Sequence, residues 1–316
     1  MKERDKREID MKLGAHVSTS GGLSKSIDRA QAIGAEAIQI FASSPRAWKF
    51  NFPKEEEIAL FKKKTLETGI GPCYIHGSYL VNIGGDENQL GKSIESLTNN
   101  MITAGKIGAE GVVFHGGSHK GKGFNTVLDQ AVKCLVEVLE KSPSDTWLCI
   151  ENSAGMGSHI GSSFDEIGAI IKAVNHPNLK VCLDTEHCFA AGYNIASDDA
   201  INSIMAEFDS KIGLERLVAV HANDAKVEFG SGVDRHENIG EGYIGEKGFE
   251  VILGKPAFSQ VPFFLEVPGF DGDGPDEENI NRLKAIRNKV QKEKLNVLRP
   301  FQIRCQSLQG VSAIGN

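Results

Sequence analysis

The sequence predicts an α/β fold in which eight parallel strands close into a (β/α)8 barrel, with a functional site at the carboxyl ends of the strands. Eight short apolar runs recur along the chain, and turn residues bound them. Such runs are typical of buried parallel strands. Segments with helical spacing separate them, so strand and helix alternate throughout. Most runs end at a polar side chain, and in a barrel of this kind the chemistry lies on that face.

Each expected strand leads to a residue that can lie at the mouth of the barrel. The strands and the residues that follow them are 13–15 with His16, 38–40 with Phe41 and Ser43, 73–75 with His76, 112–114 with His115, 147–150 with Glu151, 181–183 with Asp184, 217–220 with His221, and 263–265 with Glu266. The carboxyl ends of these strands share one face, so we expect the polar side chains to meet there.

Helices are predicted after the strands from apolar residues at helical spacing. The expected ranges are 22–33, 54–68, 90–108, 125–139, 163–174, 198–212, 249–253 and 277–294. Asn125 is expected to cap the fourth helix, and Ser163 with Glu166 forms a capping-box signature at the fifth. Two long loops, 76–89 and 221–248, are expected to be functional, because long loops in compact domains usually are.

The bulk composition is that of a globular chain of 316 residues, with 40% hydrophobic and 24% charged residues. We expect a charged extension at 1–11, one barrel domain at 12–294 and a flexible tail at 295–316. The six cysteines form no short-spaced pair, which favours buried thiols in a reducing compartment. Without a secretory signal or an apolar run of about 18 residues, a cytoplasmic protein with no membrane span is predicted.

The net charge of −7 by itself argues against a nucleic-acid partner, because such proteins usually present a basic face. Bound metal ions can reverse the sign of the charge at a local site, however. The overall charge therefore does not decide the question.

Residues of the types that bind metal cluster most densely late in the chain. Asp234 and His236 lie two apart in a loop, and Asp184 with His187 forms a second pair three apart. Zinc binds imidazole nitrogen and carboxylate oxygen, and a catalytic zinc site keeps one position open. A single histidine at a strand end is more often a structural group, and a single carboxylate there can cap a helix. Several together favour metal, because buried carboxylates repel unless cations lie between them.

Other polar residues have simpler interpretations. His119 and His159 are expected near the mouth as supporting or solvent-facing groups, and His176 is expected at the surface. The acidic segment 270–276 lacks the spacing of a calcium loop, so it is predicted to be a solvated turn.

Several motifs recur at the predicted strand ends and in the long loops. They are GAHVS at 14–18, SYLVN at 78–82, FHGGSH at 114–119, ENSAG at 151–155, DTEHCFAAGY at 184–193, HAND at 221–224, VDRH at 233–236 and GEG at 240–242. Together they resemble the endonuclease IV family, the zinc-dependent apurinic/apyrimidinic (AP) endonucleases of base excision repair. The resemblance extends from about residue 13 to about residue 294.

The resemblance implies a TIM barrel that holds three zinc ions. By resemblance, the first ion is bound by His76, His115 and Glu151, the second by Glu151 as a bridge with Asp184, His221 and Glu266, and the third by His187, Asp234 and His236. Mn²⁺ in some of the sites stays open, because imidazole and carboxylate suit both metals. Glu186, Cys188 and Val267 depart from the residues common in the family, but they are neighbours of ligands.

The resemblance also implies the reaction. A monomeric enzyme of DNA repair is expected to cut double-stranded DNA 5′ to an abasic site, leaving a 3′-hydroxyl and a 5′-deoxyribose phosphate, and to clean blocked 3′ ends. The metal ions would supply hydroxide and stabilise the leaving oxygen, with Glu151 and Glu266 as the catalytic residues that position the water. Arg46 and Tyr79 are predicted DNA contacts, whereas Trp48 is equally well explained by packing on the barrel rim.

Two other functions remain open at this point. A metal-dependent sugar isomerase or epimerase also carries carboxylates and histidines at strand ends, but two ions suffice for isomerisation. A protein that binds DNA lesions without catalysis is the other alternative, although binding alone does not need a bridged metal pair.

Overall fold

The structure is a computed structural model that describes residues 11–309, with side chains described up to residue 296. Eight parallel strands close into a barrel in the order β1-β10-β7-β6-β5-β4-β3-β2, which confirms the predicted fold. The barrel strands are β1 (Leu13–His16), β2 (Ile38–Phe41), β3 (Cys73–His76), β4 (Gly111–His115), β5 (Trp147–Glu151), β6 (Leu179–Asp184), β7 (Leu217–His221) and β10 (Phe263–Leu265).

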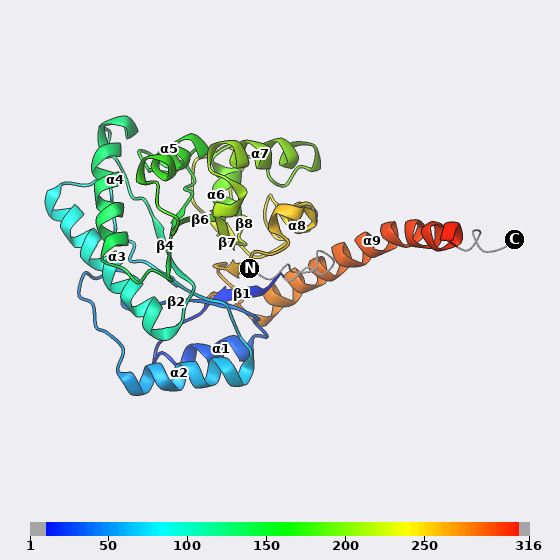
Figure 1. Cartoon of the computed structure of the whole chain (residues 1–316), viewed down its shortest axis with the longest axis horizontal. Helices are drawn as coiled ribbons and strands as arrows, with labels where there is room; N and C mark the ends of the chain where they lie inside the picture. The colour runs from blue at the N-terminus through cyan, green and yellow to red at the C-terminus, as the bar shows by residue number, and fades with distance from the viewer. Residues whose placement is uncertain (1–10, 310–316) are drawn as a thin grey trace, which may run out of the picture.

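Helices surround the barrel, as Figure 1 shows. They are α1 (Lys25–Ala32), α2 (Glu55–Thr68), α3 (Glu87–Ile107), α4 (Phe124–Glu140), α5 (Phe164–Val174), α6 (Thr185–Ala190), α7 (Asp198–Lys211), α8 (Gly245–Gly254) and α9 (Glu277–Gln309), with the 3-10 turns η1 (Leu214–Arg216) and η2 (Pro256–Phe258). The short helix α6 and the two-stranded hairpin β8 (Asp224–Ala225) and β9 (His236–Glu237) were not expected from the sequence.

Several predicted boundaries differ from those of the structure. Helix α4 begins at Phe124 after Gly123, whose φ of 89° makes the turn, so Asn125 lies inside the helix and does not cap it. Helix α9 does not end near residue 294 but continues to Gln309, and its last part extends away from the barrel (Figure 1). The expected extension at 1–11 falls almost entirely outside the described residues, as do 310–316 of the expected tail.

The interior of the barrel is divided into an apolar layer and a polar layer. One buried cluster comprises Ala37, Tyr74, Val113, Cys149, Cys182, Ala219 and Phe264. Side chains alternate between the two faces of a strand, so the residue two positions later also faces inward. These next residues are Gln39, His76, His115, Glu151, Asp184, His221 and Glu266. The alternation of the strands therefore brings one polar ring to the carboxyl end of the barrel.

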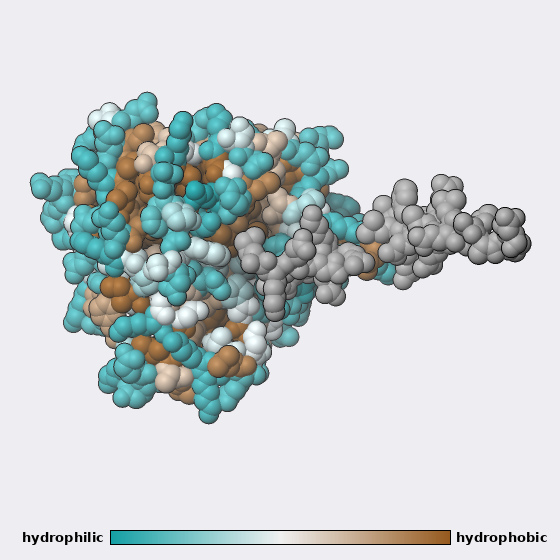
Figure 2. All heavy atoms as spheres, viewed as in Figure 1, coloured by the Kyte–Doolittle hydropathy of each residue, from teal (hydrophilic) through white to brown (hydrophobic). Residues whose placement is uncertain are grey.

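The outward faces of the strands pack against the helices in a second, larger apolar cluster. On the face of the molecule shown in Figure 2, hydrophilic side chains cover much of the outer helices, with hydrophobic ones visible between them. Within residues 11–309, no helix has the combination of length and apolar character that a membrane span requires.

Candidate metal centre

All nine predicted ligands gather at the carboxyl end of the barrel. Most come from strand ends, while His187 lies on α6, His236 on β9 and Asp234 in the loop just before it. Three sets of ligand atoms lie within 4.8 Å of one another, namely His76, His115 and Glu151; Glu151, Asp184, His221 and Glu266; and Asp184, Glu186, His187 and His236. Glu151 and Asp184 each belong to two sets, so the three groups form one continuous centre.

The first group is built around Glu151, which is fully buried. Its Oε2 lies 3.4 Å from Nε2 of His76 and 3.6 Å from Nδ1 of His115. These separations exceed ordinary hydrogen bonds, and one cation between the three atoms would bring each of them a partner.

The second group surrounds Nδ1 of His221. That nitrogen lies 3.0 Å from Oε1 of Glu151, 3.3 Å from Oε2 of Glu266 and 3.7 Å from Oδ2 of Asp184. Three carboxylates around one imidazole nitrogen carry more negative charge than a single proton can neutralise, and a divalent cation would offset it.

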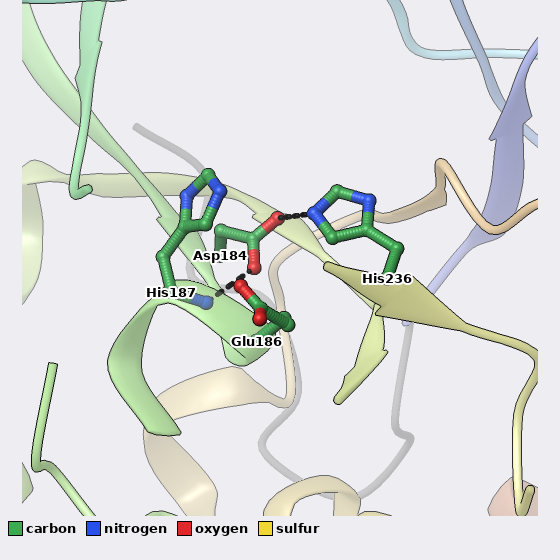
Figure 3. Close-up of side chains that lie close together, drawn as sticks. All are labelled: Asp184, Glu186, His187 and His236. Atoms are coloured by element: carbon green, nitrogen blue, oxygen red, sulfur yellow. Dashed lines mark hydrogen bonds and ion pairs between the residues drawn. The ribbon is translucent and has the colours of Figure 1, made fainter. Parts of the chain in front are cut away.

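The third group contains two carboxylates that were not in the predicted set, Asp184 and Glu186, beside the predicted His187 and His236. Figure 3 shows Asp184, Glu186, His187 and His236 converging. The predicted ligand Asp234 lies at the same place, with its two oxygens 3.3 Å from Nε2 of His187 and 3.4 Å from Nε2 of His236. Asp234 is half-exposed, so it closes the group from the side of the solvent.

Unpartnered polar atoms support metal binding at this centre. Buried polar atoms normally have a hydrogen-bond partner, and each exception calls for an explanation. Among the side chains described, those that are buried and lack a partner include His16 Nε2, His76 Nε2, Glu151 Oε2, Glu186 Oε2, His187 Nε2 and His236 Nε2. Five of these six atoms belong to the three groups, and the donor set of imidazoles and carboxylates is the one that zinc prefers.

The histidine rings are held by their other nitrogens, as metal-binding histidines usually are. Nδ1 of His76 donates to the carbonyl of Gly77 at 2.8 Å, and Nδ1 of His187 donates to the carbonyl of Asn152 at 2.9 Å. Each ring therefore presents its Nε2 to the centre. His236 is oriented in the same way by the carbonyl of Glu266, at 3.3 Å.

Gln39 holds the ring of His221, and it was not among the residues predicted from the sequence. Its side-chain oxygen accepts from Nε2 of His221 at 2.9 Å, and its amide nitrogen donates to Oε1 of Glu266 at 2.7 Å. Nδ1 of His16 lies 2.9 Å from the same Glu266 oxygen. One amide thus directs Nδ1 of His221 toward the centre and orients a second candidate ligand. The apolar run 38–40 concealed it, although strand alternation would have placed Gln39 inside the barrel.

Asp184 and the start of α6 are positioned by two asparagines. The Asp184 carboxylate accepts from the backbone N–H of His187 at 2.9 Å and so caps α6. Its other oxygen accepts from Nδ2 of Asn223 at 2.6 Å. Asn152 pairs with the backbone of Asp184 through both its Oδ1 and its Nδ2. Asp184 and His187 are therefore held in place before any cation binds.

Asp224 organises the loop that carries Asp234 and His236. Its buried carboxylate accepts hydrogen bonds from the backbone N–H groups of Ala225, Gly240, Gly242, Ile244 and Gly245. A Cβ on Gly242 would lie 2.5 Å from one Asp224 oxygen, so glycine is needed there for this close approach. The spacing of Asp234 and His236 in the sequence indicated that this loop binds metal. It did not indicate that Asp224 holds the loop in its conformation.

The ionisation of these groups is set by burial and by their charged neighbours. Burial lowers the pKa of His115 to about 4, so this imidazole is neutral near pH 7. Burial also opposes the charged form of His187, yet Asp184, Asp234 and Glu151 raise its pKa well above the ordinary value. The pKa of Asp234 falls to about 2 despite burial, because of His187 and His236. In the metal-free protein, protons therefore supply part of the positive charge.

A cavity of about 390 Å³ lies over the centre. His115, His187, Asp234, His236 and Glu266 line it, together with Tyr79 and His159 on its sides. His159 thus lies at the mouth, as expected. His176 is only half-buried and accepts from the backbone of Asn178, which agrees with a structural role near the surface.

The two predicted DNA contacts lie on adjoining loops at the rim. Tyr79 is 53% exposed, and its ring packs 5.6 Å from that of His76. The backbone N–H of Tyr79 donates to the carbonyl of Pro45 at 3.0 Å, which places the exposed Arg46 next to this loop. Trp48 is half-buried with the Lys92 ammonium 6.0 Å from its ring centre, in agreement with packing on the rim.

The chain matches the family model of xylose isomerase-like TIM barrels over residues 27–298. The protein of Halothermothrix orenii named probable endonuclease 4 is 40% identical over 276 residues, which is 87% of this chain and 99% of that protein. The crystal structure of endonuclease IV from Thermus thermophilus has a TM-score of 0.77 and 33% identity, covering 89% of this chain and 99% of the other. A D-tagatose 3-epimerase-like protein, with a TM-score of 0.67, 18% identity and coverage of 90% and 100%, shows likeness of fold alone.

Proposed function

The chain belongs to the endonuclease IV family of xylose isomerase-like TIM barrels, and on that premise we propose that it is a metal-dependent endonuclease of DNA repair. The proposed substrate is double-stranded DNA with an abasic site, cut on the 5′ side to leave a 3′-hydroxyl and a 5′-deoxyribose phosphate. Removal of blocking groups from 3′ ends, a monomeric state and a cytoplasmic location are parts of the same proposal.

The observation that carries the proposal is the continuous centre in which Glu151 and Asp184 link three groups of ligand atoms. We propose that each group holds one Zn²⁺, with Mn²⁺ able to replace it in some of the groups. The nine ligands would be those expected from the sequence. Three groups also favour a nuclease over a sugar isomerase, for which two ions are enough.

Zinc ions held by these residues would lower the pKa of a bound water toward neutral pH and would supply positive charge for the phosphate and the leaving oxygen. The side chains provide the positioning. Glu151 and Glu266 both lie beside Nδ1 of His221, at 3.0 and 3.3 Å, and we propose that these two carboxylates orient the attacking water. Glu266 also lines the cavity, and we propose that it accepts the proton of that water. Gln39 and His16 hold Glu266 in this orientation.

Selection of the abasic nucleotide would depend on access to the cavity. A nucleotide without a base has no stacking or pairing to lose, so it leaves the duplex at little cost. Tyr79 lines the cavity, and Arg46 lies on the adjoining loop. We propose that these two side chains contact the DNA around the flipped nucleotide, the tyrosine by stacking and the arginine at a phosphate.

A synthetic duplex with a single abasic site tests the proposal. We expect zinc-loaded protein to cut it 5′ to the lesion at neutral pH and to leave an end that a polymerase extends. The same duplex with an intact base should stay uncut. Failure to cut the abasic duplex, with zinc shown to be bound, would overturn the nuclease function.

Metal analysis of the purified protein provides an independent measurement. The three groups predict about three zinc ions per chain. A value near two, together with activity on a ketose or aldose, would instead support the isomerase alternative.

A further inference from the structure

Glu186 is a buried carboxylate that the proposed mechanism does not use. It is the second residue of α6 and has 0% exposure. Its Oε1 accepts a hydrogen bond from the backbone N–H of Arg235 at 3.0 Å. Its Oε2 is buried and lacks a hydrogen-bond partner among the side chains described. A buried carboxylate oxygen without a partner costs free energy unless something binds it.

The surroundings of Glu186 identify what can bind it. Glu186, Asp184, His187 and His236 each place one ligand atom within 4.8 Å of the others. Figure 3 shows the Glu186 carboxylate beside that of Asp184, with the two imidazoles on either side. No lysine or arginine ion pair with Glu186 occurs among the side chains described. Two adjacent carboxylates repel each other, and a cation between them removes the repulsion.

We propose that Glu186 is a further ligand of the third metal ion, bound through Oε2 next to His187, His236 and Asp234. This inference rests on the proposed metal centre and adds a carboxylate to it. Oε1 stays bonded to the backbone of Arg235, the residue between Asp234 and His236. A single side chain would therefore join α6, the ligand loop and the ion.

Glu186→Gln is the decisive variant, because it preserves size and the acceptor for Arg235 while replacing Oε2 by an amide that donates. Zinc retention is measured by titration with a chelator of known affinity. We expect one of three ions to dissociate at a free zinc concentration at least about tenfold higher than in the unchanged protein. Even the loss of an outer partner of a metal ligand typically lowers metal affinity by about this factor. Glu237→Gln is the matched control, since Glu237 lies on the same loop but pairs with Lys226.

Cobalt substitution distinguishes a ligand from a positioning residue. With Co²⁺ in the centre, removal of a direct ligand changes the visible absorption bands, whereas loss of an outer hydrogen bond leaves their positions unchanged. We expect Glu186→Gln to shift the bands and Glu237→Gln to preserve them. Unchanged retention, or weakened retention with unchanged bands, would each overturn direct ligation by Glu186.

The two proposals fail in different ways. If the unchanged protein binds no zinc, the metal centre itself is wrong. If it binds three ions and cuts abasic DNA while Glu186→Gln matches it in retention and absorption, only the role of Glu186 is wrong.

Discussion

Replacement of Gln39 by leucine tests whether one buried amide prepares the second metal group. Leucine has a similar size but neither donates nor accepts. The change removes the 2.9 Å bond from Nε2 of His221 and the 2.7 Å bond to Oε1 of Glu266. We expect weaker metal binding at the second group, because His221 would lose the partner that directs its Nδ1 toward the centre.

The size of the effect follows from these two contacts. Glu266 keeps its contact with His16 at 2.9 Å, so the main loss falls on His221, whose Nε2–H would be buried without an acceptor. An unsatisfied buried donor costs about 1–3 kcal/mol. Loss of an outer partner of a metal ligand typically weakens affinity by roughly 10–100-fold, or about 1.4–2.8 kcal/mol. The two ranges agree, so we expect the free energy of zinc binding at the second group to weaken by about 1.4–2.8 kcal/mol.

The assay is a zinc titration with a competing chelator, followed by cleavage of the abasic duplex at saturating and at limiting zinc. Gln39→Leu should recover much of its activity at saturating zinc, since the nine ligands remain. Gln31→Leu, at an exposed glutamine of α1, is the control for the substitution itself. Zinc affinity in Gln39→Leu within about twofold of the unchanged protein would refute the reasoning, because the loss of an outer partner of a metal ligand lowers affinity by roughly an order of magnitude or more.

Further predictions concern catalysis, DNA binding and pH. Glu266→Gln or His115→Ala should nearly abolish cleavage, with a loss of about 10²–10⁴-fold for a proton acceptor; ordinary rates would remove that residue from the mechanism. Arg46→Ala should weaken DNA binding and lower the magnitude of the slope of log affinity against log salt concentration by roughly one. Lys62→Ala on α2 should leave both the affinity and this slope unchanged. Equal slopes for Arg46→Ala and the unchanged protein in binding titrations would exclude a phosphate contact by Arg46. Burial opposes the charged forms of His187 and His221, but carboxylates, and for His221 also Cys182, raise both pKa values well above 6.5. Their contribution to the stability of the metal-free protein is therefore complete below that pH and is lost as pH rises through the folded pKa values. The melting temperature of the metal-free protein should fall from about pH 6 toward pH 9, while zinc should stabilise the protein less at acid pH because its ligands must lose protons. A zinc-induced rise in melting temperature that grows on acidification would contradict this.

Many features of this molecule were predictable from the sequence because they arise from local pattern. Buried parallel strands appear as apolar runs, and helical spacing between them indicates the barrel. A strand end in such a barrel faces the mouth, so His76, His115, Glu151 and His221 were recognisable from position and residue type. The motifs that resemble endonuclease IV then implied a grouping of the ligands, which stays a prediction.

Helix boundaries and local anchors were less accessible. The Ser163 side chain caps α5 as expected, by accepting from the backbone N–H of Glu166. The Glu166 carboxylate, however, accepts from the backbone N–H of Gly161 and not from that of Ser163. The hairpin of β8 and β9 has only two residues in each strand, too short for a periodic pattern. Asp224 anchors the ligand loop by accepting N–H groups that lie up to 21 residues away, a contact that no local pattern records.

Residue type and order along the chain determined the barrel, the polar mouth and the candidate ligands that gather there. Only the tertiary structure decided which nitrogen of each histidine faces the centre, that Gln39 bridges His221 to Glu266, and that Oε2 of Glu186 lies unpartnered beside Asp184. The physical reason is that alternation and apolar burial depend on near neighbours in the chain. The orientation of a buried polar atom depends on partners from distant strands, which meet only when the barrel closes.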